Sequence, residues 1–259
     1  MSAQRVRIAS RDNALLMRVR RLHATPDAYR RLGSVWLEGD HLVRAALARG
    51  WPLQELLVAA ARADDPALQP LWSRVPKLRV VDDALWSGLG ALSSKAPLAA
   101  LVAWPGERPV QSRRRSVVLD RVQDAGNLGS ILRSAAAFGV AQVVALKGCA
   151  ALWSPKVMRA AMGAHFALHL VEGADESALD GLDVPLLATS SHGAVSLLDS
   201  TLPDPCAWVL GHEGQGVAPA LLQRCAQRVG IPQPGGEESL NVAAAAAVCL
   251  YEAMRQRAQ

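Results

Sequence analysis

The chain has 259 residues, of which 51% are hydrophobic, and it carries a formal net charge of +5. A chain of this length forms one large domain or two modest ones, and none of its apolar runs approaches the roughly 18–20 residues that a membrane-spanning helix needs. Residues 1–11 are basic but lack the apolar segment of a secretory signal, so we expect a cytoplasmic protein with no part in the membrane.

The positive charge is concentrated in the front of the chain. Residues 1–112 hold 16 Lys and Arg against 10 Asp and Glu, whereas residues 113–259 hold 12 against 13. Guanidinium groups suit phosphate oxygens because they form forked hydrogen bonds. The front half is therefore expected to meet nucleic acid, with a merely solvated arginine surface as the alternative.

The first part of the sequence alternates strands and helices. A basic extended segment precedes a helix with apolar residues at Leu15, Leu16, Val19 and Leu22. Further strands are expected at 35–37, 54–60, 77–81 and 98–104, with helices at 40–48 and after 82, which favours an α/β domain. The pattern breaks at Pro105 and Gly106, so we expect a first domain at 1–108, a linker at 109–115 and a second domain at 116–259.

The second part repeats the β-α alternation with short connections. Strands are expected at 117–119, 141–146, 184–191, 207–210 and 229–231, and helices at 127–139, 154–166, 217–226 and 242–251. Asn127 is expected to cap the first of these helices after a turn at 124–126, and Ser239 or Asn241 the last. This alternation predicts a parallel sheet covered on both faces.

Three glycine-bearing loops, at 124–130, 210–217 and 231–241, each follow an expected strand. Such loops emerge at one edge of a parallel sheet, where ligands of open α/β sheets bind. Their polar side chains are those of Asn127, Arg133, His212, Glu213, Ser239 and Asn241. This inventory suits a polar substrate and a nucleotide-like cofactor.

The sequence gives little support for a metal-binding site. The cysteines at 149, 206, 225 and 249 form no CxxC pair, which argues against both a structural zinc site and a disulfide framework. His165 and His169 have no third ligand in view, and His212-Glu213 lacks the second histidine of a zinc helix because Gly216 stands there. We expect no metal.

The three loops together resemble the motifs of the SpoU/TrmH branch of the SPOUT RNA methyltransferases. The matching patterns are Asn-Leu-Gly-x-x-Leu-Arg from Asn127, Leu-Gly-x-Glu-x-x-Gly from Leu210, and Ile-Pro-x-x-Gly-x-x-x-Ser-Leu-Asn from Ile231. They occur in the order of that family and span most of residues 116–255. The segments 9–22 and 36–47 also resemble the small α/β RNA-binding domain that precedes many such enzymes and is similar to kink-turn-binding ribosomal proteins.

The resemblance implies methylation of a ribose 2′-hydroxyl in RNA with S-adenosyl-L-methionine, by a homodimer whose C-terminal parallel sheet contains a deep trefoil knot. Ribosomal RNA is favoured over transfer RNA as the substrate. The implied catalytic residues are Arg133, Asn127, Glu213, Ser239 and Asn241. The implied cofactor-binding residues are Leu210, Gly211, Gly216, Ile231, Gln233, Ser239 and Leu240. The expected RNA-binding residues are Arg7, Arg11, Arg18, Arg20, Arg21 and Arg133.

Some positions depart from the family pattern, and some alternatives stay open. Ala125 stands where proline is usual, His212 where asparagine is common, and Gln233 where methionine is frequent. Arg133 is the family's proposed proton acceptor, although an arginine is normally protonated, so positioning of phosphate and ribose is its other role. The competing functions are a transfer RNA methyltransferase, a non-catalytic RNA-binding protein and a nicotinamide-dependent oxidoreductase, the last without the G-x-G-x-x-G fingerprint.

Overall fold

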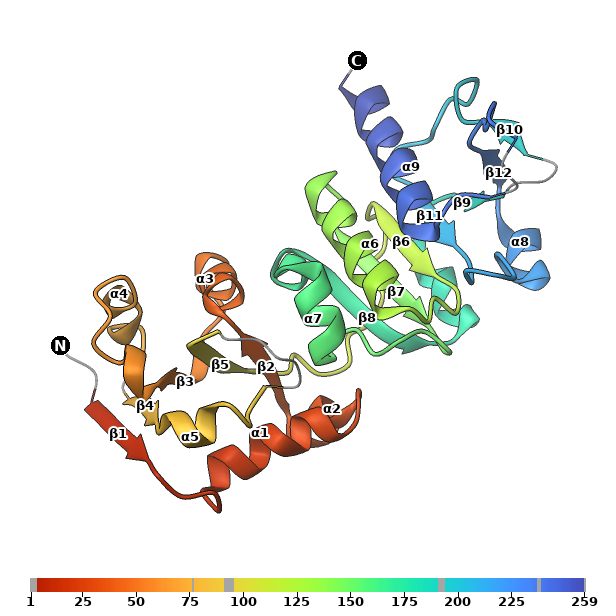
Figure 1. Ribbon diagram of the computed structural model, residues 1–259. Coiled ribbons are helices and arrows are strands. Elements are labelled where there is room, and N and C mark those ends of the chain that lie inside the picture. The colour runs from red at the N-terminus through yellow and green to blue at the C-terminus, as the bar shows by residue number, and fades with distance from the viewer. Residues whose placement is uncertain (1–3, 76, 91–95, 191–193, 237–238, 259) are drawn as a thin grey trace. The chain divides into compact units, whose positions relative to one another are not determined.

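The computed structural model describes residues 4–75, 77–90, 96–190, 194–236 and 239–258. The chain divides into two compact units, one made of residues 1–106 with 153–166 and the other of residues 107–152 with 167–259 (Figure 1). Each unit has a sheet of its own.

The first unit is built on a five-stranded sheet in the order β1-β4-β3-β5-β2. Its strands are β1 (Gln4–Ile8), β2 (Ser34–Glu38), β3 (Leu53–Ala59), β4 (Lys77–Val81) and β5 (Leu98–Ala103). Strands β1, β4 and β3 are parallel, whereas β5 runs antiparallel to both β3 and β2. The α/β character expected for this region is present, but the sheet is mixed because β5 returns between β3 and β2.

Helices α1 (Ala14–Ala24) and α3 (Asp40–Ala48) lie on opposite sides of this sheet (Figure 1). Asn13 caps α1 by accepting from the backbone N–H of Leu15 at 3.0 Å, as a residue of its type does in front of a helix. Leu16, Val19 and Leu22 are buried along one stripe of α1, at the spacing of a helix with a single apolar face. The remaining helices of the unit are short: α2 (Ala28–Leu32), η1 (Ala60–Arg62), α4 (Gln69–Trp72), α5 (Asp83–Trp86) and α7 (Pro155–Ala161).

The second unit is built on a seven-stranded sheet in the order β10-β12-β9-β11-β6-β7-β8, and every recorded pairing in it is parallel. Its strands are β6 (Ser116–Leu119), β7 (Gln142–Leu146), β8 (His169–Ala174), β9 (Leu186–Thr189), β10 (Val195–Ser196), β11 (Ala207–Leu210) and β12 (Gln227–Gly230). This confirms the predicted parallel α/β sheet. Strands β8 and β10 were not foreseen in the sequence.

Both faces of the second sheet are covered, as a parallel sheet requires. One face packs Val118, Val144 and Val209 against α8 (Pro219–Arg224) and the 3-10 helix η3 (Glu176–Leu182). The other face carries α6 (Ala125–Ala137) and α9 (Val242–Arg257), which lie side by side in Figure 1. The alanine-rich start of α9 leaves short side chains there, so the two helices approach closely.

Two helix predictions needed correction. Asp124, not Asn127, is the N-cap of α6, because its carboxylate accepts from the backbone N–H of Asn127 at 2.7 Å and Ala125 is already helical. The helix expected at 154–166 ends at Ala161, because Met162 adopts a left-handed backbone with φ of 50° and a short 3-10 turn, η2 (Ala164–Ala167), follows.

Candidate active site

The three glycine loops follow β6, β11 and β12 and therefore leave the second sheet at the same edge. Parallel strands all end on one side, so residues more than a hundred positions apart in the sequence are brought together there. The structure thus confirms the geometric part of the prediction, which is that these loops share one region.

A chain of three polar side chains joins the loops. The Asn127 amide Nδ2 donates to Glu213 Oε1 at 3.2 Å, and the Asn241 Nδ2 donates to Asn127 Oδ1 at 2.9 Å. Asn241 Oδ1 accepts in turn from the backbone N–H groups of Ala243 and Ala244, at 2.9 and 3.2 Å, and so caps α9. One asparagine therefore both starts a helix and fixes the amide of another.

Glu213 also holds the backbone of the first loop. Its carboxylate accepts from the N–H of Asp124 at 3.1 Å and from that of Gln123 at 3.4 Å. Partial burial raises the pKa of Glu213, but the hydrogen bonds from its own backbone N–H, from Asn127 and from these two N–H groups outweigh burial and leave the pKa below its ordinary value. The carboxylate is therefore ionised at neutral pH and already occupied by donors.

The loop at 211–217 is held from its other side by Asp120 and Arg121, which the sequence analysis did not single out. Asp120 is buried and accepts from Arg121 Nε at 2.9 Å and from the N–H of Ala218 at 2.7 Å. Arg121 reaches on to Gln215 Oε1 at 2.8 Å, and its bond to Asp120 raises the pKa of the guanidinium. The sequence signal that could have identified Asp120 is a carboxylate directly after the end of β6, because a residue at that position lies at the same edge of the sheet as the three glycine loops.

The same loop closes on itself at Gly211 and Gly216. The N–H of His212 donates to the carbonyl of Gly216 at 3.1 Å, and the N–H of Gly216 donates back at 2.8 Å. A Cβ on Gly211 would lie 2.1 Å from the backbone of Gly216 and of Val217, and Gly216 has a φ of 67°. Both glycines are thus required by geometry, one by close approach and the other by a left-handed backbone.

A cleft of about 480 Å³ opens between the second and third loops. This volume is within the roughly 300–1,000 Å³ of ordinary ligand pockets. Of the residues expected to bind a cofactor, those that line it are Gly211, Gly216, Ile231, Gln233, Ser239 and Leu240. Leu210 lies fully buried at the end of β11, where its carbonyl accepts from the N–H of Asp120.

The cleft contains an unused hydrogen-bond acceptor. The side-chain oxygen Oε1 of Gln233 is buried and has no partner among the described residues. Buried polar atoms are nearly always hydrogen-bonded, so a donor from outside the described residues is expected at this oxygen. His212 and Glu213 also line the cleft, beside the backbone of the glycine loop.

Arg133 and the two asparagines are placed differently from the other expected catalytic residues. Glu213 and Ser239 line the cleft, whereas Asn127 and Asn241 are not among the described residues that line it. Asn127 is hydrogen-bonded to Glu213, and Asn241 is hydrogen-bonded to Asn127. Arg133 lies on the exposed side of α6 and is not among the described residues that line the cleft.

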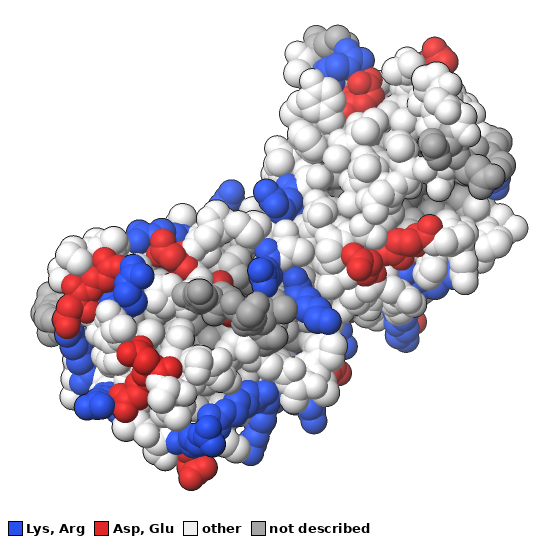
Figure 2. All heavy atoms as spheres, viewed as in Figure 1, with Lys and Arg blue, Asp and Glu red and all other residues white. Residues whose placement is uncertain are grey.

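The arginines expected to bind RNA have different surroundings in the first unit, over which Figure 2 shows many basic side chains. Arg7 forms an ion pair with Asp82 at 2.7 Å, and Arg18 donates to the hydroxyl of Ser34. Arg11 and Arg21 are exposed. Arg20, which donates to the carbonyl of Arg11 at 2.8 Å, lines with Arg11 a hollow of about 380 Å³.

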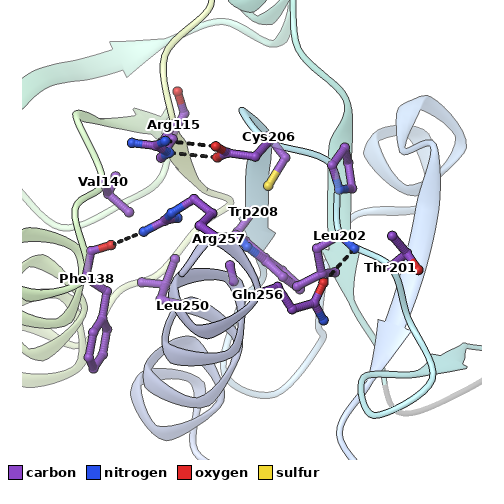
Figure 3. Close-up of a pocket in the computed structure, with 14 residues that line it drawn as sticks. Arg115, Phe138, Val140, Thr201, Leu202, Cys206, Trp208, Leu250, Gln256 and Arg257 are labelled. Carbon is purple, nitrogen blue, oxygen red and sulfur yellow. Dashed lines mark hydrogen bonds and ion pairs between the residues drawn. The ribbon is translucent and has the colours of Figure 1, made fainter. Parts of the chain in front are cut away.

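A smaller pocket of about 190 Å³ lies at the opposite, amino-terminal edge of the second sheet (Figure 3). Arg115 and Asp204 form a two-point ion pair there at 2.7 and 2.8 Å, and Arg257 donates to the carbonyl of Phe138 at 2.8 Å. The indole N–H of Trp208 in its wall has no partner among the described residues. None of the three glycine loops reaches this pocket, so it is separate from the candidate site.

The described residues offer neither a metal site nor a membrane-spanning helix. In the ranges that the structure describes, no group of three or more His, Cys, Asp or Glu side chains is placed to hold a metal ion. No helix in those ranges is long and apolar enough to cross a membrane. All four cysteines are unpaired, and burial raises the pKa of Cys249 to about 12.

Comparison with known proteins supports one family. Residues 114–251 match the SpoU rRNA methylase family. The chain is 33% identical to an uncharacterized tRNA/rRNA methyltransferase of Synechocystis over 96% of its own length and 94% of the relative's. It is 31% identical to the 23S rRNA (guanosine(2553)-2′-O)-methyltransferase RlmP of Bacillus subtilis, over 83% and 86%. The crystal structure of the SpoU methyltransferase AviRb from Streptomyces viridochromogenes with AdoMet superposes with a TM-score of 0.86 at 29% identity, covering 95% of this chain and 99% of that one.

Proposed function

The chain belongs to the SpoU rRNA methylase family, and from that premise we propose that it transfers a methyl group from S-adenosyl-L-methionine to a ribose 2′-hydroxyl of ribosomal RNA. The observation that carries the proposal is the hydrogen-bonded chain Glu213–Asn127–Asn241, which ties the three family loops around one cleft. Similarity to 23S rRNA enzymes extends through the front of the chain as well as the family region. This favours ribosomal RNA over transfer RNA as the substrate.

The described residues fit S-adenosylmethionine. The unpaired Oε1 of Gln233 can accept from an amino group, and the backbone around Gly211 and Gly216 can approach a ligand closely because no side chain intervenes. Ile231 and Leu240 supply apolar wall on the other side of the cleft. When bound, the cofactor supplies an electrophilic methyl group on a positively charged sulfur.

The side chains around the cleft act by alignment. Glu213, Asn127 and Asn241 hold the loops in register, so the position of a bound ribose relative to the methyl group is fixed by contacts that exist before RNA arrives. Ser239 presents a hydroxyl at the cleft wall. Arg133, exposed on α6, is assigned to an RNA phosphate and to the ribose, since a guanidinium binds phosphate oxygens through paired donors.

A homodimer is part of the proposal. Val248 and Tyr251 lie three residues apart on α9 and are 42% and 51% exposed, and Tyr251 packs edge-on against Phe138 beside the end of α6. Exposed apolar side chains that gather on one face are typical of an interface with another protein. A second copy docked there would also lie near α6, which carries Arg133. The deep trefoil knot is proposed from family membership.

The first unit is proposed to bind the RNA, as a domain similar to kink-turn-binding ribosomal proteins. Arg11, Arg20 and Arg21 are the arginines we assign to phosphate contacts, because Arg11 and Arg20 flank an open hollow and Arg21 is exposed. Arg7 has a carboxylate partner within its own unit. The cytoplasmic location expected from the sequence stays a prediction.

Methylation of RNA by purified protein tests the function. We expect the wild type to transfer a labelled methyl group from S-adenosylmethionine to one ribose of ribosomal RNA, and Arg133→Ala to lose this activity while still binding the cofactor. Arg114→Ala is the matched control, because Arg114 is an exposed arginine of the same unit outside the cleft. Cofactor binding without methyl transfer to any RNA would favour a non-catalytic RNA-binding protein.

A further inference from the structure

His212 lies in the glycine loop with its ring turned back onto the loop's own backbone. Its Nδ1 accepts from the N–H of Gly214 at 3.0 Å and from that of Gln215 at 3.2 Å. The backbone of His212 is meanwhile paired with Gly216 in both directions. The imidazole therefore fills the inside of the turn that forms one wall of the cleft.

Two backbone donors at one ring nitrogen define the chemical state of the ring. A nitrogen that accepts must carry a lone pair, and the neutral ring with its N–H at Nε2 is the form that offers one at Nδ1. In an imidazolium both nitrogens are donors. A proton on Nδ1 would point at two N–H groups, and both hydrogen bonds would be replaced by donor-donor contacts.

Among the residues that the structure describes, the charged groups around the loop do not offer the two N–H groups another acceptor. The Glu213 carboxylate is engaged by Asn127 and the N–H of Asp124, and the buried Asp120 carboxylate by Arg121 and Ala218. Arg121 binds Gln215 from outside the turn, and Arg228 lines the cleft with a further positive charge.

We propose that His212 is a positioning residue for cofactor binding. Its neutral ring holds the glycine loop in the conformation that binds S-adenosylmethionine, which we call the latched loop, and protonation of the ring frees the loop from this conformation. The proposal rests on the function proposed above. Since the latched loop requires the neutral ring, proton binding and cofactor binding oppose each other. Affinity for the cofactor should fall as the solution is acidified.

The test is calorimetric titration of the full-length chain with S-adenosylmethionine from about pH 8 to about pH 5.5, the range in which histidine side chains ordinarily change charge. His212→Asn keeps a side-chain acceptor for the same N–H groups but has no proton to gain. His212→Ala also has no proton to gain but lacks the side-chain acceptor. His41→Asn, an exposed histidine of the first unit, controls for the loss of a histidine as such.

We expect acidification to weaken binding by the wild type and by His41→Asn about tenfold more than binding by His212→Asn, as the joint loss of two hydrogen bonds at the lower end of the usual net contribution would do. His212→Ala should bind weakly at every pH, and His212→Asn should restore binding at about pH 8. Equal pH profiles for the wild type and His212→Asn, or full affinity of His212→Ala, would overturn the proposal.

Amide hydrogen exchange of the cofactor-free protein separates this proposal from the proposed function. Protection of the Gly214 and Gln215 amides should fall on acidification in the wild type relative to His212→Asn at the same pH. If protection behaves in this way but the wild type never binds S-adenosylmethionine, the proposed function fails, and with it the cofactor part of the inference. If protection does not differ between the two proteins, the latch itself is refuted.

Discussion

The close approach at Gly211 gives the most direct test of how the cleft is built. A Cβ at this position would lie 2.1 Å from the backbone of Gly216 and of Val217, whereas ordinary contact begins at 3.4 Å. In Gly211→Ala the two backbone segments must therefore separate by about 1.3 Å, the difference between those distances. Because the obstacle is backbone rather than a flexible side chain, we expect the cost at the upper end of overpacking, about 3 kcal/mol.

That cost corresponds to a melting temperature lower by roughly 6–12 °C in a chain of this size. Cofactor affinity should fall more than tenfold, because the displaced segment is the cleft wall itself. Gly235→Ala is the matched control: it lies in the third loop, and a Cβ there would meet nothing within 4 Å. Thermal unfolding and calorimetric titration of both variants would decide the matter. Near wild-type stability and affinity in Gly211→Ala would refute the steric argument.

Two further sets of substitutions probe the polar chain and the basic front. Asn241→Ala should destabilise the protein by about 1–2 kcal/mol through loss of the α9 cap. Asn241→Ser should recover stability but not methyl transfer, since serine can cap the helix but has no amide to donate to Asn127. Equal melting temperatures of the two variants, or methylation by Asn241→Ser at the wild-type rate, would contradict this. Removing Arg20 and Arg21 together should reduce the slope of log K against log salt for RNA binding by about two, whereas Arg5→Ala, whose guanidinium is paired with Asp64 at 2.6 Å, should leave it unchanged.

The parts of the fold that follow from local chemistry were predictable. A parallel sheet was indicated by short apolar strands alternating with helices, and the shared edge followed because parallel strands end on one side. The start of α9 was also predictable, as one of two capping candidates, and Asn241 is the one that caps it. Strand β10 escaped because it has only two residues, too few for any periodicity to show.

Other features depended on contacts that no local pattern reveals. Asn127 and Asp124 are both of residue types that cap helices. In the structure the Asp124 carboxylate caps α6, and the side-chain amide of Asn127 is therefore free to hydrogen-bond with Glu213 and Asn241. The pairing of Arg7 with Asp82 arises because β1 and β4 are neighbours, although 75 positions separate the two residues. A count of basic residues along a sequence therefore overstates the positive charge that is available to bind a polyanion.

The same contacts bear on the proton that a ribose hydroxyl must lose during attack. Glu213 is at the cleft, but its pKa is lowered and its oxygens are occupied by Asn127 and backbone donors, so it is a weak base. The Nδ1 of His212 is occupied by two N–H groups. Arg133 is a guanidinium, which remains protonated in proteins, and a neighbouring RNA phosphate would favour that charged form further. The described side chains are therefore suited to aligning a hydroxyl with a methyl group, with the hydroxyl proton passing to solvent water. Once cofactor is bound, we expect the transfer rate to respond to misalignment more strongly than to pH.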